Sequence, residues 1–415
     1  MQHAPSVEFH HPQGFLSLAK NIGIKDSTLD LAVIYSTVRA RAAAMFTRNR
    51  FPGAPVIVGR KHVANGYVQA LVINSKNANV AMGKQGLDNA IETCRLVGKE
   101  LGISPYDVLP FSTGVIGRPL PMDKIRAGLK GIRSELKPDN LKLAAEAIMP
   151  ETAFVSTAIP YVNAKPHVGF ALEIVQADAI ARYFRLIGYD TFFLTGTDEN
   201  SLKNVRAAAE LGISTQELCD QNSAAFQALI PGLNIANNDF IRTSEETRHS
   251  RGAQKLWTQS GVGDIYKKHY TGLYCVGCED FYTEKEVPNG VCPDHETPLE
   301  KVEEENYFFR LSAYQDQLIR LIETEHLRIV PATRKNEMLA FARAGLHDFS
   351  ISRNRERAGN WGIPVPGDST QVMYVWYDAL ANYITALDYA DEGERLRKYW
   401  IECNKRIHGA RGAFA

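Results

Sequence analysis

The sequence lacks a long apolar run, an excess of either charge and a dense set of cysteines. No stretch of about 18 apolar residues occurs, so no membrane-spanning helix is expected. The 47 Lys and Arg residues equal the 47 Asp and Glu residues, which excludes the basic composition of a dedicated nucleic-acid binder. Six cysteines in 415 residues are too few for a disulfide scaffold. Since the N-terminus also lacks a signal-peptide pattern, we expect a soluble, cytoplasmic protein.

The charge is distributed unevenly along the chain. Residues 1–150 carry 19 Lys and Arg against 11 Asp and Glu, whereas residues 151–415 carry 28 against 36. A length of 415 residues suits two or three domains of about 150 residues each. The change of sign therefore predicts separate units that meet near residue 150.

Short β-rich runs and helical patterns alternate in the first 150 residues. We expect buried strands at 29–36, 55–58 and 67–74, and helices at 86–101 and 121–136. This alternation is typical of an α/β layer.

The second part of the chain opens with a strand, helix, strand pattern. The runs 153–158 and 191–195 flank a helix expected from 168 to 187, and a crossover of this kind implies parallel strands in a nucleotide-binding type of sheet. Residues 311–326 predict a long helix, and residues 372–376 predict another buried strand that leads into a helix. Residues 265–305 are rich in aromatic, Gly, Cys and acidic residues, which indicates a small inserted module.

Four residues of this insert have the spacing of metal ligands. Cys275 and Cys278 form one pair, and Cys292 and His295 form a second pair, separated from the first by thirteen residues. Paired soft ligands of this kind predict a closed, tetrahedral Zn²⁺ site with a structural role. The alternative is a set of unpaired buried cysteines.

Several runs in the second part resemble the catalytic domain of methionyl-tRNA synthetases over about residues 152–408. They include STAIPYVNAKPHVGF, FLTGTDENSLKN and VMYVWYDALANYITAL, in the order that the family has them. The resemblance implies a class I Rossmann-type fold that activates methionine with ATP and Mg²⁺ and then charges tRNA(Met). In that family Zn²⁺-binding knuckles occur in the connective insert.

The start of the helix expected at residue 168 is the first candidate site. A helix N-terminus with a glycine attracts phosphate, although a single His there is more often only a cap. By the resemblance His167, Gly169 and Phe170 occupy the catalytic His-x-Gly-His signature of the family. Phe170 departs from the pattern because a phenyl ring cannot donate a hydrogen bond to a phosphate, so either this branch of the family tolerates Phe at this position or adenylate formation is slower.

The resemblance also implies a methionine pocket. A thioether packs well against aromatic rings, and the ammonium of the amino acid requires one buried carboxylate, here Asp198. Without the family, Trp376 and Tyr383 would be read as core residues and Asp198 as a helix cap. The residues implied for the pocket are Ile159, Tyr161, Asp198, Trp376, Ala379, Tyr383 and His408.

Residues 13–149 resemble the first half of the bifunctional glutamate/ornithine N-acetyltransferases. The resemblance rests on runs such as VINSKNANVAMGKQGLDNA and DVLPFSTGVIGRPLP. It implies an oxyanion hole at Thr113 and Gly114, and it places Lys76 where the family has glycine. The threonine nucleophile of that family has no counterpart before the chain changes identity at Pro150.

Together these patterns predict an α/β chain made of an acetyltransferase-like lobe and a Rossmann-type synthetase unit with a zinc-knuckle insert. The expected parts are 1–149 for the incomplete lobe, 150–264 and 306–390 for the two Rossmann halves, 265–305 for the insert and 391–415 for a divergent tail. We expect methionine activation, impaired because the Lys-Met-Ser-Lys-Ser loop and the anticodon-binding domain of the family are not found. The alternatives are an N-acetyltransferase of arginine synthesis and a non-functional chimeric chain.

Overall fold

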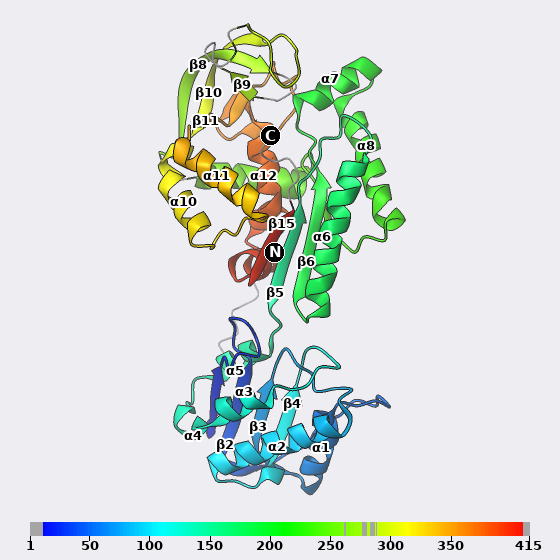
Figure 1. The fold of residues 1–415 in the computed structure, drawn as a ribbon, viewed down its shortest axis with the longest axis vertical. Helices are drawn as coiled ribbons and strands as arrows, with labels where there is room; N and C mark the ends of the chain where they lie inside the picture. Colours follow the sequence, from blue (N-terminus) through cyan, green and yellow to red (C-terminus); the bar gives the residue numbers. More distant parts are fainter. Residues whose placement is uncertain (1–10, 261–262, 276–279, 283–286, 288, 410–415) are drawn as a thin grey trace. The chain divides into compact units, whose positions relative to one another are not determined.

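The protein, seen here as a computed structural model, consists of two compact units. The structure describes residues 11–260, 263–275, 280–282, 287 and 289–409 (Figure 1). Unit 1 comprises Met1–Ala153 with Arg182–Thr191, and unit 2 comprises Phe154–Ala181 with Phe192–Ala415. Among the described residues, no helix combines the length and the apolar character that crossing a bilayer requires.

Unit 1 contains a four-stranded sheet in sequence order. Its strands are β1 (Phe15–Lys20), β2 (Leu31–Arg41), β3 (Tyr67–Asn74) and β4 (Val108–Ser112). β2 is antiparallel to both β1 and β3, whereas β3 and β4 are parallel. The parallel pair is joined through helix α2 (Gly83–Leu101), as a parallel connection requires.

Helices cover both faces of this sheet. Because successive side chains of a strand point to opposite faces, Leu31 and Val33 of β2 enter the core under α1 (Ala54–His62) and α2, while Ala32 packs against α5 (Leu141–Ile148). α3 (Met122–Leu129) contributes to the same core as α1 and α2. Both faces of the sheet are therefore buried.

Two local expectations for unit 1 were wrong. The run at residues 55–58 is not a strand but lies within α1, because Pro55 favours the first turn of a helix and a short apolar run suits either structure. The single helix expected at 121–136 is divided into α3 and α4 (Ile132–Glu135), since Gly131 between them has a φ of 75°.

The central sheet of unit 2 has the order β15-β5-β6-β7. β5 (Thr152–Thr157) and β6 (Asp190–Thr197) are joined through helix α6 (Val168–Leu186), and β6 is parallel to β7 (Asp239–Arg242) (Figure 1). The expected strand, helix, strand crossover is confirmed. β15 (Lys405–Gly409) lies beside β5, so a distant segment completes the sheet.

Two antiparallel sheets accompany the central sheet of unit 2. The insert contains β8 (Ile265–Cys275), β9 (Asp280–Tyr282) and β10 (Glu300–Phe309), and β8 pairs with both of its neighbours. β10 also pairs with β11 (Phe349–Ser350). The other sheet consists of β12 (Ser352–Asn354), β14 (Asp368–Met373) and β13 (Pro364–Val365).

Unit 2 also contains several further helices. The strand expected at 372–376 ends at Met373, because residues from Val375 onward form α12. The helix expected from Leu311 begins with a short 3₁₀ turn, Leu311–Tyr314, before α10. The helices are α7 (Leu202–Leu211), α8 (Thr215–Gly232), α9 (Arg251–Gln259), α10 (Gln315–Glu323), α11 (Ala332–Ala344), α12 (Val375–Thr385) and α13 (Glu394–Leu396).

We expect Gly196→Ala to destabilise unit 2 by about 2 kcal/mol, because an added Cβ would lie 2.1 Å from the carbonyl oxygen of Ile241 in β7. The measurement is the urea midpoint of the unit 2 transition. Gly232→Ala is the matched control, since nothing lies within 4 Å of a Cβ added there. Equal midpoints for the two variants would contradict the close approach of β6 and β7.

Candidate functional site

Three of the residues expected in the pocket meet where β6 ends. Tyr161 and Asp198 form an isolated parallel bridge, and the backbone N–H of Asp198 donates to the carbonyl oxygen of Pro160 at 2.8 Å. The Trp376 ring N–H donates to the Tyr161 hydroxyl at 3.0 Å. Asp198 is 4% exposed. A buried carboxylate and two aromatic side chains therefore share one region of unit 2.

One face of α12 supplies the next pocket residues. Trp376, Ala379 and Tyr383 are three and four residues apart, which places them on the same side of the helix. The Tyr383 ring contacts the His408 ring edge-on, with centroids 4.7 Å apart. Ser156 of β5 lies 3.1 Å from Nδ1 of His408. α12, β5 and β15 thus bring several of the expected residues together, and Ile159 lies half-buried in the loop after β5.

Two titratable rings of this region, Tyr383 and His408, favour their neutral forms. Burial, together with the nearby Glu173 and Asp198 carboxyl groups, raises the pKa of the Tyr383 phenol to about 12. Burial lowers the pKa of His408. At neutral pH this region therefore places two uncharged rings near the buried Asp198 side chain, a combination that suits a ligand with an apolar side chain and an ammonium group.

The start of α6 places the expected catalytic residues in different surroundings. The backbone N–H of Gly169 donates to Nδ1 of the exposed His167 at 3.0 Å, so His167 caps the helix N-terminus. Phe170 is buried, and its ring packs edge-on against Phe226 of α8 with centroids 4.9 Å apart. The side chain of Phe170 therefore contributes to the hydrophobic packing between α6 and α8.

A buried ion pair beside Asp198 was not anticipated from the sequence. The fully buried Glu199 carboxylate accepts two hydrogen bonds from Arg242, at 2.7 and 2.9 Å. It also accepts from Thr197 and Ser223, both at 2.8 Å. Burial lowers the pKa of the Arg242 guanidinium, but its hydrogen bonds to Glu199 and Asp220 outweigh that effect and raise the pKa. The only signal in the sequence was the adjacent acidic pair in TGTDEN.

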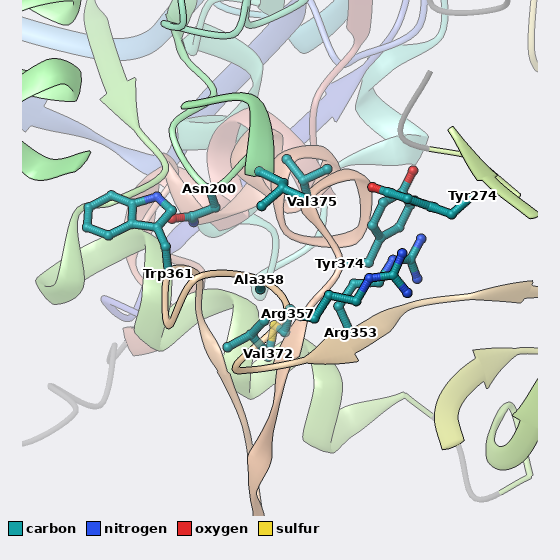
Figure 2. Close-up of a pocket in the computed structure, with 11 residues that line it drawn as sticks. Asn200, Tyr274, Arg353, Arg357, Ala358, Trp361, Val372, Tyr374 and Val375 are labelled. Carbon is teal, nitrogen blue, oxygen red and sulfur yellow. The ribbon is translucent and has the colours of Figure 1, made fainter. Parts of the chain in front are cut away.

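A pocket lies next to this ion pair, and its lining includes Asn200 and Val375, which are close in sequence to Asp198 and Trp376. Figure 2 shows Trp361 and Asn200 on one side and two arginines near Tyr274 on the other. The Trp361 ring N–H donates to the carbonyl oxygen of Glu199 at 2.7 Å. The Arg353 guanidinium lies over the Tyr374 ring, 4.0 Å from its centroid. None of the residues expected for the methionine pocket is among those that line it.

Three of the four expected metal ligands lie together in the insert. The Sγ atoms of Cys275 and Cys292 are 3.9 and 3.7 Å from Nδ1 of His295. All three ligand atoms lie within 4.8 Å of one another. Cys278 lies outside the described residues. The donor set matches the soft ligands that zinc prefers.

In unit 1, Thr113 and Gly114 lie beside the turn after β3. Gly114 has a φ of 126°, and an added Cβ would lie 2.3 Å from the backbone carbonyl carbon of Lys76. Lys76 also has a positive φ, of 67°, and its ammonium pairs with Glu151 at 2.9 Å and Asp26 at 3.2 Å. The Lys76 side chain, which stands where the acetyltransferase family has glycine, is therefore held by two carboxylates of unit 1.

Two protein families match the chain. The profile of the ArgJ family matches residues 17–168, and that of class I tRNA synthetases (M) matches residues 153–301 and 294–410. These matches confirm the two resemblances noted in the sequence, with a change from one family to the other near residue 153.

Curated relatives and a solved structure match the second part. The chain is 49% identical over 255 residues to the methionine–tRNA ligase of Brucella suis biovar 1. This match covers 60% of this chain and 49% of the relative. It is 43% identical over 251 residues to that of Thermotoga maritima, covering 60% of this chain and 39% of the relative. The methionyl-tRNA synthetase of Mycobacterium tuberculosis bound by methionyl-adenylate is 43% identical with a TM-score of 0.58, and the match covers 62% of this chain and 51% of that chain. The chain spans about half the length of the Brucella relative.

We expect Glu199→Gln to destabilise unit 2 by about 2–4 kcal/mol, because it leaves the Arg242 charge without its buried partner. Asp391→Asn is the control, since its ion pair with Arg251 is exposed and contributes under about 1 kcal/mol. Both values are measured from urea unfolding followed by tryptophan fluorescence. A Glu199→Gln midpoint equal to that of the control would show that the network does not stabilise the unit.

Proposed function

The chain belongs to the family of class I tRNA synthetases (M) through residues 153–410, and on that premise we propose that unit 2 activates methionine with ATP. A carboxylate oxygen of methionine forms a bond to the α-phosphorus of ATP, and the bond to the leaving pyrophosphate breaks. The methionyl group of the product, methionyl-AMP, then forms an ester with a terminal ribose hydroxyl of tRNA(Met), and the bond to the leaving AMP breaks. Since ATP and tRNA are cytoplasmic, we propose that the protein acts there.

The buried Asp198 is the observation that carries this proposal. Its carboxylate accepts the ammonium of methionine beside the aromatic side chains of Tyr161 and Trp376. The thioether packs against Trp376, Tyr383 and His408, because a polarizable sulfur is favoured beside aromatic rings. A neutral Tyr383 and a neutral His408 leave this end of the pocket uncharged, which excludes ligands with a charged side chain.

We propose that the start of α6 binds the phosphates of ATP, which enters as its Mg²⁺ complex. The helix N-terminus attracts negative charge, and the exposed His167 imidazole can donate a hydrogen bond to a phosphate oxygen. Phe170 supplies no donor, since its ring is packed against Phe226. The loss of one donor to the transition state typically lowers the rate about 10²–10³-fold. Methionine binding and the rate of its activation are therefore separable in this chain.

We expect Asp198→Asn to weaken methionine binding at least about 50-fold while the fold is retained, because the ammonium loses its counter-charge but the side chain keeps its shape. Titration calorimetry with methionine measures the affinity, and exchange of pyrophosphate into ATP measures adenylate formation. Asp316→Asn, at an exposed position of α10, is the control.

Phe170→His supplies the second arm of this experiment. The pyrophosphate exchange rate should rise or stay unchanged, and methionine affinity should not change, because residue 170 lies on the phosphate side. Normal methionine binding by Asp198→Asn would remove the basis of the pocket assignment.

We propose that the insert binds one structural Zn²⁺ through Cys275, Cys278, Cys292 and His295. The proposal is supported by the convergence of three of these side chains and by their soft sulfur and nitrogen donors. A bound zinc ion would cross-link β8 to the turn before β10 and would supply no chemistry to the activation step. The ligands therefore stabilise the insert.

Protein purified from zinc-supplemented cells should contain about one equivalent of zinc, and Cys292→Ser should reduce the content to below about 0.3 equivalents. Cys403→Ser is the matched control because Cys403 lies far from the cluster in sequence and is not among its ligands. Elemental analysis that finds less than about 0.2 equivalents in the wild type would contradict the zinc site.

A further inference from the structure

Unit 1 contains a long segment with positive charges and no carboxylate. Between Leu31 and Leu87 there are eight Lys and Arg residues and neither Asp nor Glu. Five of these cations fall within the 21 residues from Arg41 to Lys61. The positive charge of unit 1 is therefore concentrated at the end of β2, in the following loop and in α1.

Packing holds this loop against α1. The Phe46 ring lies over Gly59, where an added Cβ would be 3.2 Å from a ring carbon. The Arg60 guanidinium stacks over the same ring, 5.7 Å from its centroid, and donates a hydrogen bond to the carbonyl oxygen of Thr47. Phe46 and Thr47 of the loop are therefore packed against the last turn of α1.

The cations of this surface are available to a ligand. All five are exposed, and no ion pair involves them within the part of the chain that the structure describes. Arg39, just before them, differs because it is neutralised by Asp107 at 2.9 Å. We call the five residues the basic surface: Arg41, Arg48, Arg50, Arg60 and Lys61.

Exposed apolar side chains lie between these cations. Met45 is fully exposed, and Phe51 is 66% exposed directly after Arg50. A positively charged surface with an exposed aromatic ring is suited to a single-stranded nucleic acid, because arginines contact the phosphates and the ring stacks on a base.

We propose that the basic surface of unit 1 binds the phosphate backbone of RNA without sequence preference. The partner follows from the proposed function, on which this inference rests, since charging requires tRNA. Residues 151–415 carry eight more acidic than basic residues and would repel a polyanion, so unit 1 is the part with the complementary charge. The exposed Phe51 favours a ligand with stackable bases over one that offers charge alone.

The test uses the full chain and fluorescently labelled unfractionated tRNA, titrated at 50, 100 and 200 mM salt. The triple variant Arg48→Gln, Arg50→Gln, Lys61→Gln should bind at least 10-fold more weakly at 100 mM salt, and the slope of log affinity against log salt should fall by about 2–3. The control Lys99→Gln, Lys130→Gln, Lys142→Gln removes three exposed cations elsewhere in unit 1 and should change the affinity less than 2-fold.

One further double variant and a second probe make the result decisive. The double variant Arg48→Lys, Arg50→Lys keeps both positive charges and should keep most of the affinity for tRNA. Retained affinity in this variant shows that substitution at these positions does not by itself disrupt the fold. Equal tRNA binding by the two triple variants, or no binding by the wild type, would overturn the proposal. Preferential binding of phosphatidylserine vesicles over tRNA would also overturn it. Calorimetry with methionine reports separately on unit 2. If the wild type does not bind methionine but still binds tRNA through the basic surface, only the proposed activation of methionine is rejected.

Discussion

The burial of the Glu199 carboxylate at the end of β6 is the interaction on which the geometry of unit 2 depends. Arg242 reaches it from the end of the neighbouring parallel strand, so the ion pair ties the ends of β6 and β7 together. Glu199 also accepts from Thr197 and Ser223, and its backbone N–H donates to Thr243 at 2.7 Å. Adjacent side chains of an extended segment point in opposite directions. A fixed Glu199 therefore fixes the backbone beside Asp198, which bridges to Tyr161.

The strand and helix pattern was predictable where the chain carries local signals. Gly188 marks the end of α6 within two residues of the structure, and the crossover between β5 and β6 follows from their apolar runs. The run after Gly53 was misassigned, because four apolar residues fit a strand as well as a helix and Pro55 at the first turn decided the outcome. Local pattern thus identifies long elements better than short ones.

Contacts between distant residues were not accessible from the sequence. Glu199 and Arg242 are 43 residues apart, and neither residue type in isolation indicates a buried pair. Phe170 could be recognised as a missing hydrogen-bond donor, but its packing on Phe226 depends on how α6 and α8 meet. The ion pair of Lys76 was likewise not accessible, because its partner Glu151 is 75 residues away in the sequence. From local pattern alone, the Lys76 side chain would be expected to lie in solvent. In each case the unusual residue is compensated by a partner that only the tertiary structure reveals.

The position of β15 has a consequence for how the protein is made. Ser156 and His408 are 252 residues apart, yet they lie 3.1 Å from each other at the pocket. A ribosome that adds about 5–20 residues per second needs some ten seconds or more to synthesise that interval. Throughout this time β5 lacks its outer neighbour and its buried side chains must avoid aggregation. The sheet of unit 1, complete by Ser112, can form well before then, so nascent unit 2 is the part that most needs protection by chaperones.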